Sequence, residues 1–323
     1  MDKNTNFIGI DISKNTIDVW LPAKGHFTLL NSKKGFKELL KLIETDDWCV
    51  MEATGSYYQQ LALFLYENKV RVSVMNPLVI KRFIQMKLQR NKTDKSDARM
   101  IALYASEQPL KLWHPEPEYI KECKQLNTTI DIYRKQSTAL KNKLHSIQSS
   151  GILRGEVVKS LKRQIKQLKK EVHSLEQQIE ELIKNHESQM LTNISSIPGI
   201  GKKTAMLLIS TTNAFSEFEN HKQISAYFGI APVERTSGTS IRGRSRISKS
   251  GNPAIRINLF LCSFTACKTN RQCKALYKRL VNKGKSKKLA LVAVSNKLLK
   301  QSFAIAKSGI PYDPEYRSSI SVH

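Results

Sequence analysis

The alternation of apolar and polar positions in the first hundred residues predicts an α/β domain. Five short apolar runs have the length of strands, and amphipathic segments after the third, fourth and fifth runs have apolar side chains at helical spacing. The predicted strands span 7–12, 16–21, 26–30, 48–52 and 71–75, and the predicted helices span 35–43, 57–65 and 80–86. A further helix begins at Thr93 or Asp94, either of which can cap it. Three hairpin-connected strands followed by alternating helices and strands indicate a mixed sheet.

Four carboxylates fall at the ends of these elements. Asp11 lies near the end of the first strand and Glu52 at the end of the fourth, two positions that can be neighbours in a mixed sheet. Asp94 and Asp97 are three residues apart at the start of the last helix, so they share one face with Cβ atoms about 5–6 Å apart. Four acids around one point repel each other unless cations are bound, and oxygen-only ligands favour Mg²⁺ or Mn²⁺. Two such ions about 3.5–4 Å apart can serve phosphoryl transfer.

A purely structural interpretation of the Asp94 and Asp97 pair is open as well. Acids in the first turn of a helix complement its dipole and need no metal. Asp18 and Glu67 lie on elements where a solvated position is as expected as a functional one, so we leave them out of the candidate metal site. Whether further carboxylates reach the same place decides between the two interpretations.

The segment 116–190 has a different pattern, in which apolar residues alternate between spacings of three and four. This spacing forms two heptad stripes, which are typical of long paired helices. The first stripe contains Cys123, Leu126, Ile130, Tyr133, Ser137, Leu140, Leu144 and Ile147, and the second contains Val158, Leu161, Ile165, Leu168, Val172, Leu175, Ile179 and Leu182. The break at 149–151 allows the two helices to pair with each other in a hairpin or with another chain, and the pattern leaves that choice open.

Charge narrows the class of partner. The 323 residues are enough for two or three domains, and the 53 Lys and Arg against 27 Asp and Glu leave a net charge of +26. This surplus indicates a polyanionic partner, with nucleic acid ahead of an anionic membrane. Residues 191–323 carry 22 basic and 5 acidic side chains, so most of the positive charge belongs to the last third of the chain.

Membrane insertion, disulfides and a zinc module are not indicated by the sequence. No apolar run approaches the roughly 18 residues needed to span a bilayer, and the start of the chain does not have the pattern of a signal peptide, so we expect a cytoplasmic protein without a membrane partner. The five cysteines are odd in number and include no Cys-x-x-Cys pair. The group at 262, 267 and 273 has no histidine nearby, and we interpret these cysteines as small buried apolar side chains.

Two C-terminal segments carry candidate phosphate contacts. The segment 197–205 has the look of a helix-hairpin-helix turn, in which glycines free backbone N–H groups at a helix N-terminus and Lys202 and Lys203 add charge; a plain glycine turn is the alternative. The segment 231–252 alternates small, hydroxylated and basic residues with almost no apolar content, which predicts a loop facing phosphate or a solvated basic loop. The turn at 283–288 lacks the Gly-x-x-x-x-Gly-Lys-Ser/Thr pattern, so ATP binding is not supported.

Four blocks of the sequence resemble one known family. The residues 7–14, 52–57, 76–77 and 91–99 resemble the signature blocks of the DEDD transposases of bacterial insertion sequences, the group related to the Piv and MooV site-specific DNA invertases. The resemblance implies an RNase H-like N-terminal domain of the RuvC type, with the four family acids at Asp11, Glu52, Asp94 and Asp97. It also implies a homo-oligomer, a dimer or tetramer, that works on DNA with a structured noncoding guide RNA from the element's own ends.

The same resemblance suggests a nucleophile in the last domain. The family's C-terminal block uses a serine followed by glycine, and the matching position is Ser237; Ser240, Ser245, Ser248 and Ser250 are rivals that composition alone does not exclude. Because the acids and this serine belong to separate domains, a complete site can draw on two protomers. The expected nucleic-acid contacts are Lys92, Arg99, Lys202, Lys203, Arg242, Arg244, Arg246, Lys249 and Arg256.

The sequence therefore predicts three domains: an RNase H-like metal-binding domain at 1–112, a helical coiled-coil linker or oligomerisation region at 113–190 and a mainly α transposase domain at 191–323. The predicted function is DNA cleavage and rejoining by a carboxylate-bound Mg²⁺ or Mn²⁺ site and a serine nucleophile. One alternative is a RuvC-like junction nuclease that uses water, and another is a non-enzymatic protein that organises DNA or RNA.

Overall fold

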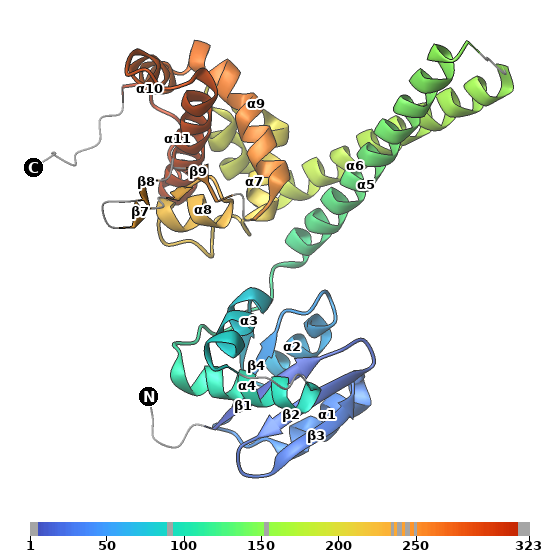
Figure 1. The fold of residues 1–323 in the computed structure, drawn as a ribbon, viewed down its shortest axis with the longest axis vertical. Helices are drawn as coiled ribbons and strands as arrows, with labels where there is room; N and C mark the ends of the chain where they lie inside the picture. Colours follow the sequence, from blue (N-terminus) through green and yellow to red (C-terminus); the bar gives the residue numbers. More distant parts are fainter. Residues whose placement is uncertain are drawn as a thin grey trace, which may run out of the picture. The chain divides into compact units, whose positions relative to one another are not determined.

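The computed structural model describes residues 6–88, 93–151, 155–233, 236–237, 241–242, 246–248 and 251–315. The chain forms two compact units, Met1–Pro115 and Glu116–His323. The elements of both units are labelled in Figure 1. The middle and last predicted domains share the second unit, because one apolar core joins residues of both: Cys123 and Ile183 of the long helices belong to the same cluster as Ile209 and Leu298.

A five-stranded mixed sheet forms the centre of the first unit (Figure 1). Its strands are β1 (Phe7–Ile12), β2 (Thr16–Leu21), β3 (Gly25–Leu30), β4 (Trp48–Glu52) and β5 (Arg71–Met75), in the spatial order β3-β2-β1-β4-β5. The hairpin-connected strands pair antiparallel, and β4 runs parallel to both β1 and β5. The five predicted strands and their order along the chain are therefore confirmed.

Helices cover both faces of this sheet. They are α1 (Lys33–Leu42), α2 (Tyr58–Glu67), α3 (Pro77–Met86) and α4 (Asp94–Glu107). Alternate strand residues point to opposite faces, so Ile8 and Ile10 pack with Phe36 of α1 and Leu61 of α2, whereas Val50 packs with α3 and α4. Burying a large apolar side chain contributes about 1.5–3 kcal/mol, and such side chains fix the register of β1, β2, β4 and β5.

Gly9 allows α4 to lie directly on β1. A Cβ atom at this position would be 2.0 Å from the backbone oxygen of Ala98 and 2.5 Å from the backbone nitrogen of Ala102. Ala98 and Ala102 are one helical turn apart, so a stripe of small side chains meets a strand position without a side chain. This close approach brings the start of α4 over the end of β1.

Two long helices form an antiparallel hairpin at the start of the second unit (Figure 1). They are α5 (Glu118–Ser149) and α6 (Gly155–Ser195), and Gly151 between them has φ +72°. Buried Cys123 and Ile130 of α5 share a core with Ile179 of α6, so the two heptad stripes pair within one chain. Pairing with another chain was the other option that the sequence left open.

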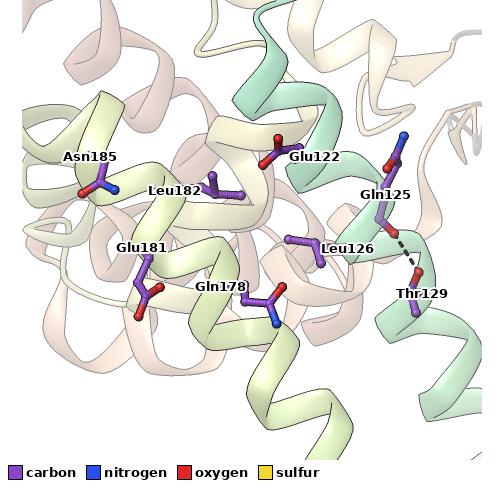
Figure 2. Close-up of a pocket in the computed structure, with 8 residues that line it drawn as sticks. All are labelled: Glu122, Gln125, Leu126, Thr129, Gln178, Glu181, Leu182 and Asn185. Atoms are coloured by element: carbon purple, nitrogen blue, oxygen red, sulfur yellow. Dashed lines mark hydrogen bonds between the residues drawn. The ribbon is translucent and has the colours of Figure 1, made fainter.

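The hairpin also contains a groove and a kink. A groove of about 520 Å³ lies between the helices, with Leu126 and Leu182 facing each other across it and mainly polar side chains along it (Figure 2). The helix α6 is interrupted at Glu187, where φ is −131° and ψ is 36°. The hydroxyl of Tyr119 on α5 donates a hydrogen bond of 2.7 Å to Glu187, and the ring of Tyr119 stacks on His186 at 4.3 Å.

Five further helices complete the second unit among the described residues. They are α7 (Lys202–Thr211), α8 (His221–Tyr227), α9 (Pro253–Thr269), α10 (Arg271–Asn282) and α11 (Lys287–Ser308). Four two-residue strands lie between α8 and α9: β6 (Pro232–Val233), β7 (Thr236–Ser237), β8 (Ile241–Arg242) and β9 (Arg246–Ile247). Within the described part of the chain, α11 alone is long and apolar enough to cross a membrane; half of its most apolar window is buried in the protein, as in the core helix of a globular unit.

Candidate carboxylate site and serine segment

The ends of two parallel strands bring Asp11 and Glu52 together. The register of β1 and β4 pairs Gly9 with Val50 and Ile10 with Met51, and its continuation by one residue sets Asp11 beside Glu52. Paired residues of neighbouring strands point to the same face of a sheet. The face of Gly9 is the face covered by α4, so both carboxylates point toward that helix.

The cap of α4 fixes the position of the other two acids. Thr93 and Ser96 form a capping box: the Ser96 backbone N–H donates to Thr93 Oγ1 at 3.1 Å, and the Thr93 backbone N–H donates to Ser96 Oγ at 3.0 Å. Asp94 and Asp97 therefore lie in the first helical turn, and α4 packs on β1, β2 and β4. Of the two caps that the sequence allows, Thr93 and Asp94, the structure has Thr93.

The four acids are electrostatically coupled at Asp11. The pKa of Asp11 is raised from 3.8 to about 6, first by burial and then by the negative charges of Asp97 and Glu52, with a smaller contribution from Asp94. The Ile12 backbone N–H donates to Asp11 Oδ1 at 2.9 Å and opposes this shift. The structure thus brings together the four predicted carboxylates and leaves a local excess of negative charge.

The donor set suits a hard divalent cation. In the described part of the chain, no group of three or more His, Cys, Asp or Glu side chains is arranged closely enough to hold a metal ion as it stands. The four carboxylates nevertheless supply only oxygen ligands, and their mutual repulsion at Asp11 is the kind that a bound cation removes. The residues at this edge of the sheet therefore fit Mg²⁺ or Mn²⁺ in ligand chemistry.

The two acids that we left out of the candidate site have different environments. Asp18 is only 6% exposed, and its Oδ1 accepts a hydrogen bond of 2.6 Å from Thr28 and lies 2.9 Å from His26 Nε2. It is paired directly with Asp11 across the β1–β2 ladder, so it shares the face of the site while its charge is engaged elsewhere. Glu67 is the exposed last residue of α2.

The contact between Arg99 and Trp20 was not predicted from the sequence. Arg99 is exposed on α4, two residues after Asp97, and its guanidinium carbon lies 5.5 Å from the ring centroid of Trp20 on β2. Trp20 pairs with Gly9 in the ladder, which sets it on the α4 face of the sheet. The alternation of β2 indicates which face Trp20 takes, but the partner of the tryptophan depends on how α4 crosses the strand.

The lysines of the predicted helix-hairpin-helix turn have acidic partners on α6. Lys202 Nζ lies 2.5 Å from Glu180, and Lys203 Nζ lies 2.6 Å from Glu176. Gly199 in the same turn has φ +105°, and a Cβ there would meet the backbone of Ala266 on α9 at 2.9 Å. The turn therefore packs helices against each other, and a phosphate would compete with two glutamates for these lysines.

The predicted serine loop contains short ladders. β7 pairs with β8 through Ser237 and Ile241, and β6 pairs with β9 through Val233 and Arg246. Branched residues recur along a segment that we expected to be irregular, which favours extended pairing. Ser237 and Arg242 are described in their backbone alone, whereas the predicted contacts Lys92, Arg244 and Lys249 and the rival serines at 240, 245 and 250 lie outside the described residues.

Arg256 closes the base of this segment. Its Nη1 donates to the backbone oxygen of Phe228 at 3.0 Å and to that of Gly251 at 3.2 Å. Gly251 has φ +80°, and a Cβ there would lie 1.9 Å from the backbone oxygen of Tyr227. Arg256 therefore connects the residues before and after the serine segment, a structural role beside the DNA contact predicted from sequence. Arg246, by contrast, is exposed on β9.

A mixed sheet with coupled acids at the ends of β1 and β4 and at the start of a covering helix defines an RNase H-like domain of the DEDD type. Comparison with known proteins gives the family. Residues 8–149 match the DEDD transposase family of the IS110 type, and residues 191–278 match the transposase family IS116/IS110/IS902. The chain belongs to the DEDD transposases of this IS110 group, which are DNA transposases and recombinases.

Relatives match along nearly the whole chain. The pilin gene-inverting proteins of Moraxella bovis and Moraxella lacunata are each 30% identical over 325 residues, which cover 95% of this chain and 97% of each relative. The transposase for insertion sequence element IS1111A of Coxiella burnetii is 23% identical over 333 residues, covering 91% of this chain and 88% of the relative. The family implies dependence on a divalent metal and binding to DNA.

Proposed function

We propose that this chain cleaves and rejoins DNA with two chemical groups, a divalent-metal site at Asp11, Glu52, Asp94 and Asp97 and a nucleophile at Ser237. The observation that carries the proposal is the environment of Asp11, whose pKa is raised to about 6 first by burial and then by the charges of Asp97, Glu52 and Asp94. Acids that only stabilise the start of a helix would not need to lie beside two strand-end acids on the same face of the sheet. Mg²⁺ or Mn²⁺ bound there would supply Lewis-acid polarisation of a phosphate and stabilise the developing charge on a leaving oxygen.

The protein groups divide the work. Attack of Ser237 Oγ on the scissile phosphorus forms a phosphoserine ester, and the bond from phosphorus to the leaving sugar oxygen breaks. The serine proton passes to a base, and the leaving oxygen gains a proton to become a hydroxyl. The ester conserves the phosphodiester bond energy, so that a second hydroxyl can attack it to rejoin strands. Arg242, Arg244, Arg246 and Lys249 would neutralise phosphate charge around the serine.

A guide RNA and a homo-oligomer belong to the same proposal. The 22 basic side chains of residues 191–323, against 5 acidic ones, support contact with a polyanion and suit DNA alone equally well; the structured noncoding RNA encoded by the element is added by the family resemblance. A dimer or tetramer would let the acids and the serine of one site come from different protomers. Measuring the molar mass of the protein in solution, with and without RNA transcribed from the element's ends, tests RNA binding and oligomerisation together.

The experiment on the nucleophile is cleavage of end-labelled element DNA by the full chain with Mg²⁺, followed by denaturing separation of protein-linked DNA. We expect wild type to form a covalent adduct, and Ser237→Ala to lose both the adduct and strand cleavage. Ser248→Ala is the matched control, because it lies in the same segment and should keep both. Cleavage by Ser237→Ala without an adduct would instead favour a RuvC-like nuclease that uses water.

The experiment on the carboxylates separates catalysis from binding. Asp11→Asn should abolish cleavage and adduct formation while DNA binding survives, because one metal ligand is lost and the fold keeps its shape. Glu67→Gln, which removes an exposed carboxylate at the end of α2, is the control and should retain cleavage. Full recombination by Asp11→Asn would reject the metal site and leave a protein that only organises nucleic acid.

A further inference from the structure

A second group of side chains lies on the same sheet face as the four acids. Along β2 and β3 the ladder pairs Trp20 with His26 and Asp18 with Thr28, and Asp18 is itself paired with Asp11. Paired residues share a face, so this row continues the face of the carboxylate site toward the edge strand β3. Neighbouring strands are about 4.8 Å apart, which sets β3 about 10 Å from β1.

Arg99 of α4 and the side chains of this row are each held by a neighbouring side chain. Arg99 has its guanidinium 5.5 Å from the Trp20 centroid, the distance range of a cation–π contact. His26 is oriented through Nε2, 2.9 Å from buried Asp18, and its side chain is 22% exposed. Asp18 also accepts from Thr28 at 2.6 Å, so the aspartate has partners on the same strand pair. Arg99, Trp20 and His26 therefore place a guanidinium, an aromatic ring and an imidazole in fixed positions on this face.

Charge explains why such a row is needed beside the acids. A DNA strand that places a phosphate among four carboxylates also brings flanking phosphates into a region of negative potential. Residues 1–115 carry 17 basic and 12 acidic side chains, so the first unit has little general excess of positive charge to offset this repulsion. A basic group fixed at the border of the acidic site, on the side that leads to β3, offsets it locally.

We propose that Arg99, Trp20 and His26 form a contact surface for the DNA strand next to the scissile phosphate. Arg99 binds a flanking phosphate, Trp20 holds the guanidinium in place, and His26 contacts the strand further along toward β3. Asp18 is a positioning residue that acts through His26. This inference rests on the proposed function of the four acids, and it adds the path that the DNA takes across the first unit.

The chain contains a matched control for the Arg–Trp pair. Arg71 on β5 lies 5.4 Å from the ring centroid of Trp48 on β4, almost the same geometry as the pair of Arg99 and Trp20. Trp48 is the first residue of its strand and Glu52 the last, so the control pair lies at the opposite end of the sheet from the acids. Arg71→Gln removes one cation of the same type without touching the proposed surface.

The test measures binding of the full chain to a fluorescent single-stranded DNA of about 20 nucleotides in EDTA, over a range of salt. Arg99→Gln should weaken binding about threefold to tenfold and lower the slope of log affinity against log salt by about 0.7, one phosphate contact. Trp20→Leu should lower affinity in the same direction, and Arg99→Lys should recover part of it. Arg71→Gln and Trp48→Leu should bind as wild type does.

The proposed contact surface would be refuted if Arg99→Gln and Arg71→Gln weakened DNA binding equally, or if neither variant changed it. Loss of binding to RNA of the same sequence with unchanged binding to DNA would also overturn it, because the surface would then hold a different polymer. The proposed function has its own readout: cleavage by Asp11→Asn would refute the metal site, whereas binding of DNA through Arg99 in EDTA does not depend on metal. The two ideas can therefore fail separately.

Discussion

Replacing Asp11 by Asn should make the metal-free first unit more stable at neutral pH. The folded pKa of about 6 lies above the ordinary 3.8, so the folded state binds a proton more readily than the unfolded state does. The penalty for ionising Asp11 is absent below about pH 4, grows as the pH rises to about 6, and is complete above about pH 7. Asn keeps the shape and the acceptor for the Ile12 N–H while it removes the charge.

The size of this effect follows from the same pKa. A rise from 3.8 to about 6 corresponds to about 3 kcal/mol of lost stability at neutral pH. Asp11 is only partly buried, and solvent screening reduces the figure to about 1–2 kcal/mol. A gain of this size raises the unfolding midpoint of a domain of this length by roughly 4–8 °C.

The assay can be confined to the first unit. The chain has three tryptophans, Trp20, Trp48 and Trp113, and all belong to Met1–Pro115. Tryptophan fluorescence therefore follows urea or thermal unfolding of this unit in the intact protein. The samples are wild type and Asp11→Asn in EDTA, near pH 7.5 and near pH 4.

The expected result is a clear gain at pH 7.5 that disappears at pH 4. The control variant Glu67→Gln removes an exposed charge from α2 and should change stability little at either pH. A gain that is equal at both pH values, or a loss at pH 7.5, would refute the claim that burial and the neighbouring acids penalise the ionised form of Asp11 in the folded protein.

Two further substitutions test the supports of the sites. Gly9→Ala should destabilise the first unit by about 1–3 kcal/mol and reduce cleavage, because its Cβ would overlap the backbone oxygen of Ala98; unchanged tryptophan-detected unfolding would contradict this packing. Arg256→Met keeps the apolar stem but loses the bonds to Phe228 and Gly251, and should make the serine segment more sensitive to limited proteolysis at unchanged fold content, by circular dichroism. Proteolysis of Arg256→Met at the wild-type rate would contradict this structural role of Arg256.

The first unit was predictable from sequence because its elements obey strong local rules. Apolar runs with two-residue alternation gave the five strands, and Thr93, one of two candidate caps, gave the start of α4. The meeting of Asp11 and Glu52 followed from where their strands end. Asp11, Glu52 and Thr93 lie at the ends of their elements, where periodicity alone sets the direction of each side chain.

The remaining contacts depend on distances between elements that periodicity does not contain. Arg99 reaches Trp20 because α4 crosses β2 at close range, and that range is set by the missing side chain of Gly9. Lys202 and Lys203 looked free for phosphate because the sequence does not reveal that α6 passes beside them with two glutamates. Acidic partners far along the chain are therefore a feature of a basic motif that the sequence alone does not reveal.

The serine segment illustrates a different limit. Its composition of small and basic residues hides the short ladders, because two-residue strands give too few positions for alternation to be recognised. The choice of Ser237 among the serines rests on family resemblance, and the chemical role of that serine stays a prediction. The adduct assay with Ser237→Ala and Ser248→Ala decides it.

Titration of the full chain with Mn²⁺, followed by electron paramagnetic resonance of the free ion, tests the metal site most directly. We expect at least one tightly bound ion per wild-type chain, the same binding in Asp18→Asn, and loss of that binding in Asp11→Asn. Equal binding by wild type and Asp11→Asn would contradict the assignment of the four coupled carboxylates as the metal site.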